Sequence, residues 1–476
     1  MFTQKRKYIY VAILVVLALF ICLGSPLSPF GKNKPSMDSS VFLLIGKMMS
    51  NGTMPYSEVF DHKGPLLYVI NWLGMLVGGI GVWIIELIFL LASMALAYKT
   101  ARRFFGEEAS LLGTIATFIA LLNWFREGNF TESYAILFMF GGMYCLTDYF
   151  VRDYKLTDKQ TFISGLCMGA VLMLRVNLIG VWIGMCAVIF VHTIMLKKYK
   201  LLWRYVLFFI AGIVTAILPF ILWLYLKGAL GAFYHCYLEF NFNYMDAPLW
   251  NIIRSTMRMF MFPVVFVATI ILIVFFWQQI NKKKENQILS IALIATLIAT
   301  TILVAPSGKQ YGHYYMAIIP CILLPITGAI KKIRDKIKIK PAIFILLLGV
   351  FFMREFWVGI RDIGKATTFN EKNYVLAEEI KDRTQPDEPV AFIGNLCAIY
   401  LKAERFPNIY YPYFSFDAMD NPEMTDKYVE ALRLASPRVI MHEQQKFPVA
   451  IQKYIDENYT VVYTYEETMI REKNES

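Results

Sequence analysis

Acidic, basic and histidine side chains in this sequence stand beside the ends of long apolar segments. Ionisable groups are costly at membrane depth unless they face water, a partner or a substrate. Carboxylates can accept a proton from a hydroxyl group, and cations can stabilise negative charge as it develops. The residues concerned are Asp38, Asp61, His62, Lys63, Glu127, Glu132, Arg175, His235, Glu239, Arg254, Lys309 and His313. Their positions predict a polar site at one end of the apolar segments.

The elements that must position these residues are the apolar segments themselves. Of the 476 residues, 57% are apolar and 17% are charged, against about 45–50% and about 25% in a soluble domain. Each run is about long enough to cross a hydrocarbon core of roughly 30 Å. The expected eleven spans are residues 8–24, 82–99, 110–122, 132–150, 161–174, 177–195, 202–226, 255–277, 287–304, 313–330 and 341–358. The predicted fold class is a polytopic α-helical membrane protein, with residues 1–358 as its transmembrane domain.

Two apolar segments have alternative interpretations. The first follows a basic start and resembles a secretory signal, but no small-x-small cleavage site follows it cleanly, so we expect a retained anchor. The run from Gly64 to Gly79 is also apolar, but counting it as a span would invert every later loop. With eleven spans and a cytoplasmic N-terminus, the inner segments carry 22 Lys and Arg residues and the outer loops about ten. This asymmetry favours an interfacial helix at 64–79, within an outer loop at 25–81.

An odd number of spans places residues 359–476 outside the membrane. This region has ordinary soluble composition and alternates short helical and strand patterns. We expect helices at 371–383, 425–435 and 449–458, and strands at 389–393, 438–441 and 461–465. The sequence therefore predicts a small extracytoplasmic α/β domain, and a cell-membrane protein with a cytoplasmic N-terminus.

Three stretches carry most of the candidate residues. The first loop reads MDSS at 37–40 and MPYSEVFDHKGPLLY at 54–68. The loop before the fourth span reads FREGNFTE at 125–132, and SGKQYGHYY at 307–315 precedes a late span. In order and sidedness, these stretches resemble the motifs of the GT-C glycosyltransferases, which include protein O-mannosyltransferases, lipid A aminoarabinose transferases and oligosaccharyltransferases. The resemblance is strongest to bacterial members that use a polyprenyl-monophosphate sugar, and it covers most of residues 1–357.

This resemblance implies a glycosyltransferase of the hexosyl or pentosyl type that moves a monosaccharide from a polyprenyl-phosphate carrier to a glycan, lipid or protein acceptor at the outer face, with inversion. It implies that the first-loop acid, Asp38, is the general base. Four cations are candidates for the donor phosphate: Lys63, Arg175, Lys309 and His313, with Arg254 a weaker one. Acceptor or sugar contacts are assigned to Asp61, His62, Glu127, Glu132 and Tyr314. The second stretch departs from a strict Asp-x-Asp, so no metal or other cofactor is assigned, although a divalent metal stays open.

Structural roles remain open for several of these residues. Asp38 can cap the helix that begins near Ser39, and Lys63 can be an interfacial residue whose ammonium reaches water. Glu127 and Glu132 can cap the next helix. The Tyr-rich stretch 409–413 can stack on sugar rings or pack in a core. The seven cysteines have no paired spacing and are expected to be buried hydrophobes.

Two other classes of membrane protein also have many spans. A secondary transporter places charges near the midplane and shows an internal repeat, whereas here the charges gather at one face. A flippase or other partner of polysaccharide export is the second alternative. The net charge of +11 is explained by cytoplasmic Lys and Arg rather than by nucleic acid. The expected partners are therefore the bilayer, a polyprenyl-linked sugar and its acceptor.

Overall fold

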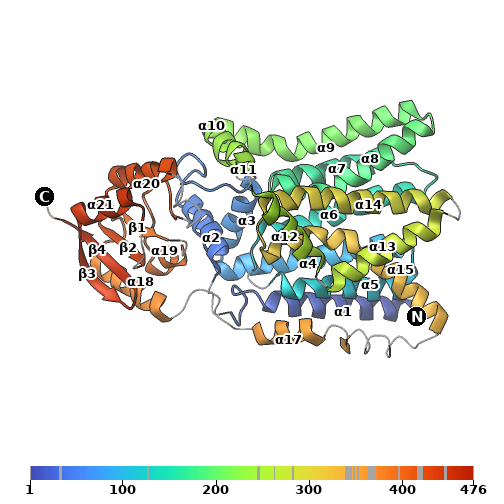
Figure 1. Ribbon diagram of the computed structural model, residues 1–476, viewed down its shortest axis with the longest axis horizontal. Coiled ribbons are helices and arrows are strands. Elements are labelled where there is room, and N and C mark those ends of the chain that lie inside the picture. Colours follow the sequence, from blue (N-terminus) through green and yellow to red (C-terminus); the bar gives the residue numbers. More distant parts are fainter. Residues whose placement is uncertain are drawn as a thin grey trace.

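The computed structural model shows a bundle of long helices with a smaller α/β unit at one end (Figure 1). It describes residues 2–31, 35–125, 128–243, 247–261, 263–280, 284–337, 343, 346, 349–350, 353–362, 371–394, 397–414, 422–443 and 447–474. The chain begins at the end of the bundle that lies far from the α/β unit. Short helices α2 (Met37–Ser50) and α3 (Pro65–Met75) lie between the bundle and that unit.

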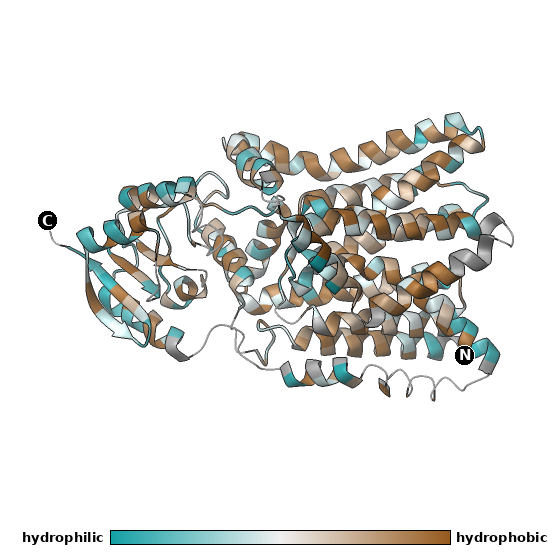
Figure 2. Ribbon diagram, viewed as in Figure 1, coloured by the Kyte–Doolittle hydropathy of each residue, from teal (hydrophilic) through white to brown (hydrophobic). Residues whose placement is uncertain are grey.

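Most expected spans coincide with a helix. The bundle helices are α1 (Phe2–Leu23), α4 (Gly79–Arg102), α5 (Glu107–Ile119), α6 (Thr131–Thr147), α7 (Asp158–Leu172), α8 (Gly180–Met195), α9 (Tyr199–Leu226), α14 (Lys284–Val304) and α15 (Ile319–Ile337). In the described part of the chain, five helices are long and apolar enough to cross a membrane, or six if one bent pair is a single span. Figure 2 shows hydrophobic residues along these helices. The count of eleven stays a prediction, and most of the expected span 341–358 lies outside the described residues.

The expected span 255–277 is bent rather than straight. It contains the end of α12 (Leu249–Phe260) and most of α13 (Pro263–Ile280), and the two helices meet at 83°. A proline at position 263 is tolerated in the first turn of α13, but it could not continue α12 because it lacks an N–H donor. Helix α12 contacts the 307–315 stretch: Ser255 Oγ donates to the Lys309 carbonyl at 2.8 Å, and Arg258 donates to Gln310 at 2.6 Å.

The run 64–79 forms the short helix α3, separate from α4. Gly64 precedes it and Pro65 is its first residue, the favoured position for a proline. A Cβ on Gly64 would lie 2.1 Å from the Met173 carbonyl oxygen, so only glycine fits where this loop passes the α7–α8 turn. Gly46 of α2 fits closely against α3, because its Cβ would lie 2.7 Å from the Asn71 carbonyl carbon. The two glycines therefore allow the close packing of α2 against α3 and of the loop before α3 against the α7–α8 turn.

The C-terminal unit is built on a four-stranded sheet in the order β1-β2-β4-β3. Strand β1 pairs parallel with β2, and the other pairs are antiparallel. Its elements are α18 (Glu371–Arg383), β1 (Val390–Ile393), α19 (Ala398–Ala403), α20 (Pro422–Ala435), β2 (Val439–Glu443), α21 (Val449–Asn458), β3 (Tyr459–Tyr465) and β4 (Thr468–Lys473). The expected helices and strands all appear with small shifts at their ends, whereas α19 and β4 were not expected. The domain boundary and the outside location stay predictions.

The two ends of the bundle differ in charge. At the end far from the C-terminal unit, the Glu108 carboxylate at the start of α5 pairs with the Arg334 guanidinium at 2.6 Å and with the Arg6 guanidinium at 3.8 Å. Lys and Arg also lie where α4 ends and where α9 begins. We call this the basic end. The opposite end carries α2, α3 and the candidate residues Asp38, His62 and Lys63.

The charge difference predicts that the basic end faces the cytoplasm and the C-terminal unit faces out. Cysteines placed at exposed Ser57 and Leu434 should react with an impermeant maleimide in intact cells, whereas one at exposed Lys155 should react only after permeabilisation. The native cysteines are buried or half-buried, so the parent chain is the control. Labelling of only one of Ser57→Cys and Leu434→Cys in intact cells would contradict this orientation.

Candidate active site

The first loop is held in a compact turn between α2 and α3. Tyr56 adopts a left-handed conformation at φ 71°, its N–H donates to the Val59 carbonyl at 2.9 Å, and its hydroxyl donates to the Lys63 carbonyl at 2.7 Å. Tyr56 is fully buried. Both hydrogen bonds that Tyr56 donates lie within the loop, so they fix the backbone that carries Asp61, His62 and Lys63.

Asp61 is buried and its two carboxylate oxygens have separate tyrosine donors. Tyr68 of α3 donates to Oδ2 at 2.7 Å, and Tyr413 of the C-terminal unit donates to Oδ1 at 3.0 Å. Burial, and then the charge of Asp61, raises the pKa of both tyrosines, so both stay protonated donors at neutral pH. The Tyr413 bond shows that the Tyr-rich stretch contacts the site. Neither sugar stacking nor core packing, the two roles considered from the sequence, includes this hydrogen bond.

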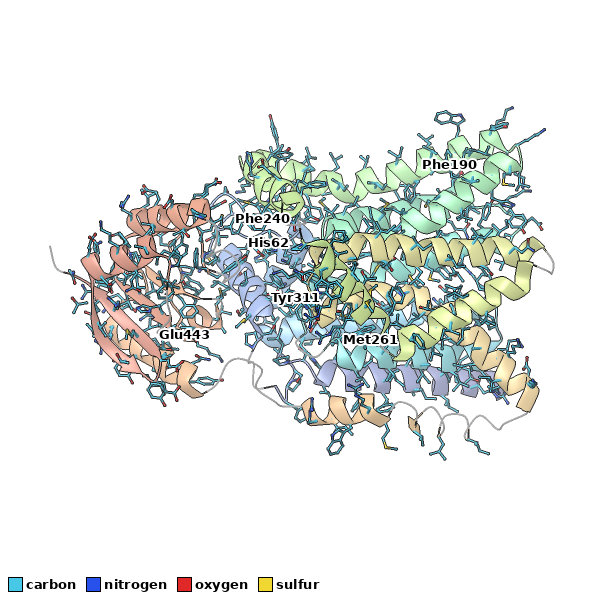
Figure 3. All side chains as sticks on the ribbon, viewed as in Figure 1. His62, Phe190, Phe240, Met261, Tyr311 and Glu443 are labelled. Carbon is cyan, nitrogen blue, oxygen red and sulfur yellow. The ribbon has the colours of Figure 1, made fainter. Side chains whose placement is uncertain are left out.

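His62 supports the Lys63 ammonium. Burial first, and then the Lys63 charge, lowers the pKa of His62 to about 3, so the imidazole is neutral. Its Nε2 lies 2.5 Å from Lys63 Nζ and accepts from the ammonium in that state. The ring packs on Phe240 with centroids 5.1 Å apart, and Asn241 donates to the His62 carbonyl at 2.7 Å (Figure 3).

Arg175 and Glu132 form a buried ion pair. Their side chains are 14% and 1% exposed, and Nη1 of Arg175 contacts Oε1 of Glu132. The guanidinium also lies over the Tyr314 ring, 4.1 Å from its centroid, which is a cation–π contact. Thr131 donates to the second Glu132 oxygen at 2.8 Å. Glu132 therefore orients Arg175, a role that differs from the helix cap considered from the sequence.

Asp38 and His313 complete the cluster. Asp38 lies in the first turn of α2, is exposed, and makes no side-chain hydrogen bond to the described residues. It is close enough to Arg175 and His313 to act on both electrostatically, and Lys63 and Glu132 also act on His313. The His313 ring stacks on Phe130 with centroids 4.1 Å apart. One carboxylate thus lies open beside Arg175 and His313.

Ser36 rather than Asp38 caps α2. The Ser36 hydroxyl accepts from the Ser39 N–H at 3.4 Å. This leaves the Asp38 carboxylate available for another role and excludes the N-cap role considered from the sequence. An acid in a first turn still interacts favourably with the helix dipole.

The remaining predicted residues fall into four groups. Arg254 is exposed on α12, and its phosphate role stays a prediction. Glu127 lies outside the described residues. Lys309 lies on the same stretch as His313, held through its carbonyl by Ser255, and its phosphate role stays a prediction. His235 and Glu239 form an exposed pair at 2.5 Å on the segment after α10 (Leu230–Phe233). Within the described residues, no group of three His, Cys, Asp or Glu side chains could hold a metal ion.

Asn129 is a central residue that the sequence reasoning missed. It is fully buried at φ 55°, and its amide donates to Ser39 Oγ at 3.1 Å and to Asn71 Oδ1 at 2.8 Å. Tyr134 donates to its Oδ1 at 2.7 Å, and Glu86 accepts from its N–H. Asn129 thus links α2, α3, α4 and α6, and its α2 partner is Ser39, the residue next to Asp38. Its place in the FREGNFTE stretch was visible, but its partners lie up to 90 positions away.

Residues 2–362 match the family described as "Putative competence-induced protein Ccs4 N-terminal domain". The chain belongs to this family. No curated protein sequence matches it.

Solved structures identify the fold as GT-C. ArnT from Cupriavidus metallidurans bound to undecaprenyl phosphate aligns with a TM-score of 0.64 at 13% identity, over 98% of each chain. Its apo form aligns at 0.61 and 14% identity, over 99% of this chain and 98% of that one. The Archaeoglobus fulgidus oligosaccharyltransferase AglB, with an inhibitory peptide and a dolichol-phosphate, aligns at 0.55 and 12% identity, over 98% of this chain and 74% of its own. This chain therefore has the GT-C fold that these multi-pass membrane enzymes share.

The Asn129 network predicts a stability effect. Asn129→Ala should lower the free energy of unfolding by about 1–3 kcal/mol, because it leaves buried partners such as Asn71 without their hydrogen bonds. Thermal unfolding in detergent measures this. Asn251→Ala on exposed α12 is the matched control and should change little. An Asn129→Ala protein as stable as the parent would show that the network does not hold α2.

Proposed function

We propose that this protein is a glycosyltransferase that moves a monosaccharide from a polyprenyl-phosphate carrier to an acceptor at the outer end of the bundle. The GT-C fold supports a transferase, and two proteins with this fold are bound to undecaprenyl phosphate and to a dolichol-phosphate. The observation that carries the proposal is the open Asp38 carboxylate beside the Arg175 cation and the His313 imidazole, with the Lys63 ammonium acting on the same imidazole. Such a site has both a proton acceptor and a place for a phosphate.

The reaction is a single displacement at the sugar's anomeric carbon. The acceptor hydroxyl oxygen attacks this carbon, and the bond from the carbon to the carrier phosphate oxygen breaks on the opposite side. The hydroxyl proton passes to Asp38, which can contribute a rate factor of about 10²–10⁴ as a general base. One attack from the opposite face inverts the configuration of the sugar.

The leaving phosphate gains negative charge, and the cationic side chains stabilise it. Arg175 presents a planar fork suited to phosphate oxygens, while Glu132 and Tyr314 hold the guanidinium in place. Lys63 is held by His62 from the other side. Such pre-positioned charge acts without reorganisation when the bond breaks. The apolar carrier tail stays among the helices, which accounts for a charged site at a bundle end.

Asp61 has a structural role in this proposal. Because both of its oxygens accept from tyrosines, it fixes the segment that carries His62 and Lys63. Direct sugar or acceptor contacts by Asp61, His62, Glu127, Glu132 and Tyr314 stay predictions.

A transfer assay identifies the sugar and the acceptor. Membranes that contain this protein are given a panel of radiolabelled polyprenyl-phosphate sugars, and the labelled product is analysed. Absence of transfer from every donor in the panel would contradict the proposed function.

Asp38→Asn tests the general base. Asparagine keeps the size of the side chain but accepts no proton at neutral pH, so turnover should fall by about 10²-fold or more, with donor binding nearly unchanged. The measurement is transfer rate and donor KM for the best donor of the panel. Because Ser36 caps α2, the variant should fold normally. The exposed acid Glu58→Gln, elsewhere in the first loop, is the control. Near-normal turnover in Asp38→Asn would exclude this role.

Arg175 and Lys63 are tested by their removal. Arg175→Ala and Lys63→Ala should each raise the donor KM and lower kcat, because the phosphate charge loses a cationic partner. In each variant, kcat/KM should fall by about 10²–10³-fold. Lys227→Ala, at an exposed loop, is the matched control.

Arg175→Ala alone also leaves buried Glu132 unpaired, which costs about 3–5 kcal/mol of stability. The double variant Arg175→Ala/Glu132→Gln removes that charge. It should regain stability but not activity. Recovery of activity in the double variant would show that Arg175 is only a structural partner of Glu132.

A further inference from the structure

A cavity lies at the basic end of the bundle, away from the candidate active site. It has a volume of about 840 Å³ and is lined mainly by residues of α13, α14 and α15. Helix α15 begins just after the stretch that carries His313 and ends with the residues that line this cavity, so the two sites lie at opposite ends of one helix. The volume is within the range of about 300–1,000 Å³ typical of ligand sites.

The walls of this cavity are hydrocarbon-like. Leu289 and Leu293 of α14, Leu272 of α13 and Leu324 of α15 are all buried and form its floor. Toward its opening, Ile270 is 44% exposed and Val274 47% exposed. Large apolar side chains that face outward here favour contact with lipid chains rather than with water.

The mouth of the cavity is cationic. Lys331, Lys332 and Lys336, all exposed, lie in the last turns of α15 and line it together with one acid, Asp335. Asp335 pairs with Lys331 at 3.0 Å. The charge at the mouth is therefore positive, with three lysines against one carboxylate.

We propose that this cavity binds an anionic phospholipid, with its acyl chains against the apolar floor and its phosphate at the lysines. The basic end is the one expected to face the cytoplasm, and the cytoplasmic leaflet carries anionic lipids that basic pockets between helices recognise. A soluble phosphate would leave the apolar walls exposed, and a zwitterionic lipid brings no net charge to the mouth. This site does not depend on the glycosyl transfer proposed above.

Native mass spectrometry of the detergent-purified full chain tests the proposal with palmitoyl-oleoyl phosphatidylglycerol as the probe. The parent should retain this lipid in preference to the phosphatidylcholine with the same chains. Each lysine near an anionic surface changes binding by about fivefold, so Lys332→Gln/Lys336→Gln should weaken it by about 25-fold. Ala329→Phe, which fills the lined space without a charge change, should weaken it as well.

The matched control removes the same charge at the same end, outside the cavity: Lys155→Gln/Lys159→Gln, both exposed, should bind as the parent does. Unfolding temperatures show whether each variant is folded, and a destabilised Ala329→Phe is replaced by Val274→Phe on the facing wall. Equal retention of phosphatidylcholine, or equal loss in the control pair, would overturn the proposal. Undecaprenyl phosphate that displaces phosphatidylglycerol in the parent but not in Lys332→Gln/Lys336→Gln would also overturn it, because the occupant would then be the carrier.

Discussion

The buried pair of Arg175 and Glu132 is the interaction on which the site depends. Either charge alone would be costly so near an apolar bundle, and together they are stable only in one geometry. Glu132 belongs to the start of α6, Arg175 to the α7–α8 turn, and Tyr314 to the stretch before α15. Satisfying this pair therefore fixes three segments relative to one another and presents a guanidinium beside Asp38.

The C-terminal unit takes part in the same arrangement. Phe60 N–H donates to the Tyr410 carbonyl at 2.6 Å, and Tyr410 donates to the Tyr56 carbonyl at 2.9 Å. With the Tyr413 bond to Asp61, these contacts hold the first loop against the unit. Because His62 and Lys63 follow Asp61 directly, the position of their side chains depends on a segment some 350 residues later in the chain. The unit is therefore a structural part of the candidate active site.

The bundle separates two kinds of charged surface. One end collects carboxylates, imidazoles and a few cations in a partly buried cluster, and the other collects lysines and arginines that are mostly exposed or paired with Glu108. A buried cluster has a low local dielectric, which strengthens interactions with a developing charge. An exposed basic surface instead suits the headgroups of a membrane leaflet. The same fold thus separates a partly buried polar cluster at one end from an exposed basic surface at the other.

Apolar length and turn residues predict the helices of the bundle, the α/β character of the C-terminal unit and the stretches that form the site, because these signals depend on nearby positions. It placed Asp38, Lys63, Arg175 and His313 in one region through the order of their segments. The pairing of Glu132 with Arg175, of Asn129 with Ser39 and of Tyr413 with Asp61 appears only in the folded chain. These contacts join residues 43, 90 and 352 positions apart. Local patterns cannot specify such pairs, because they form only when packing brings distant buried polar groups together and each must find a partner.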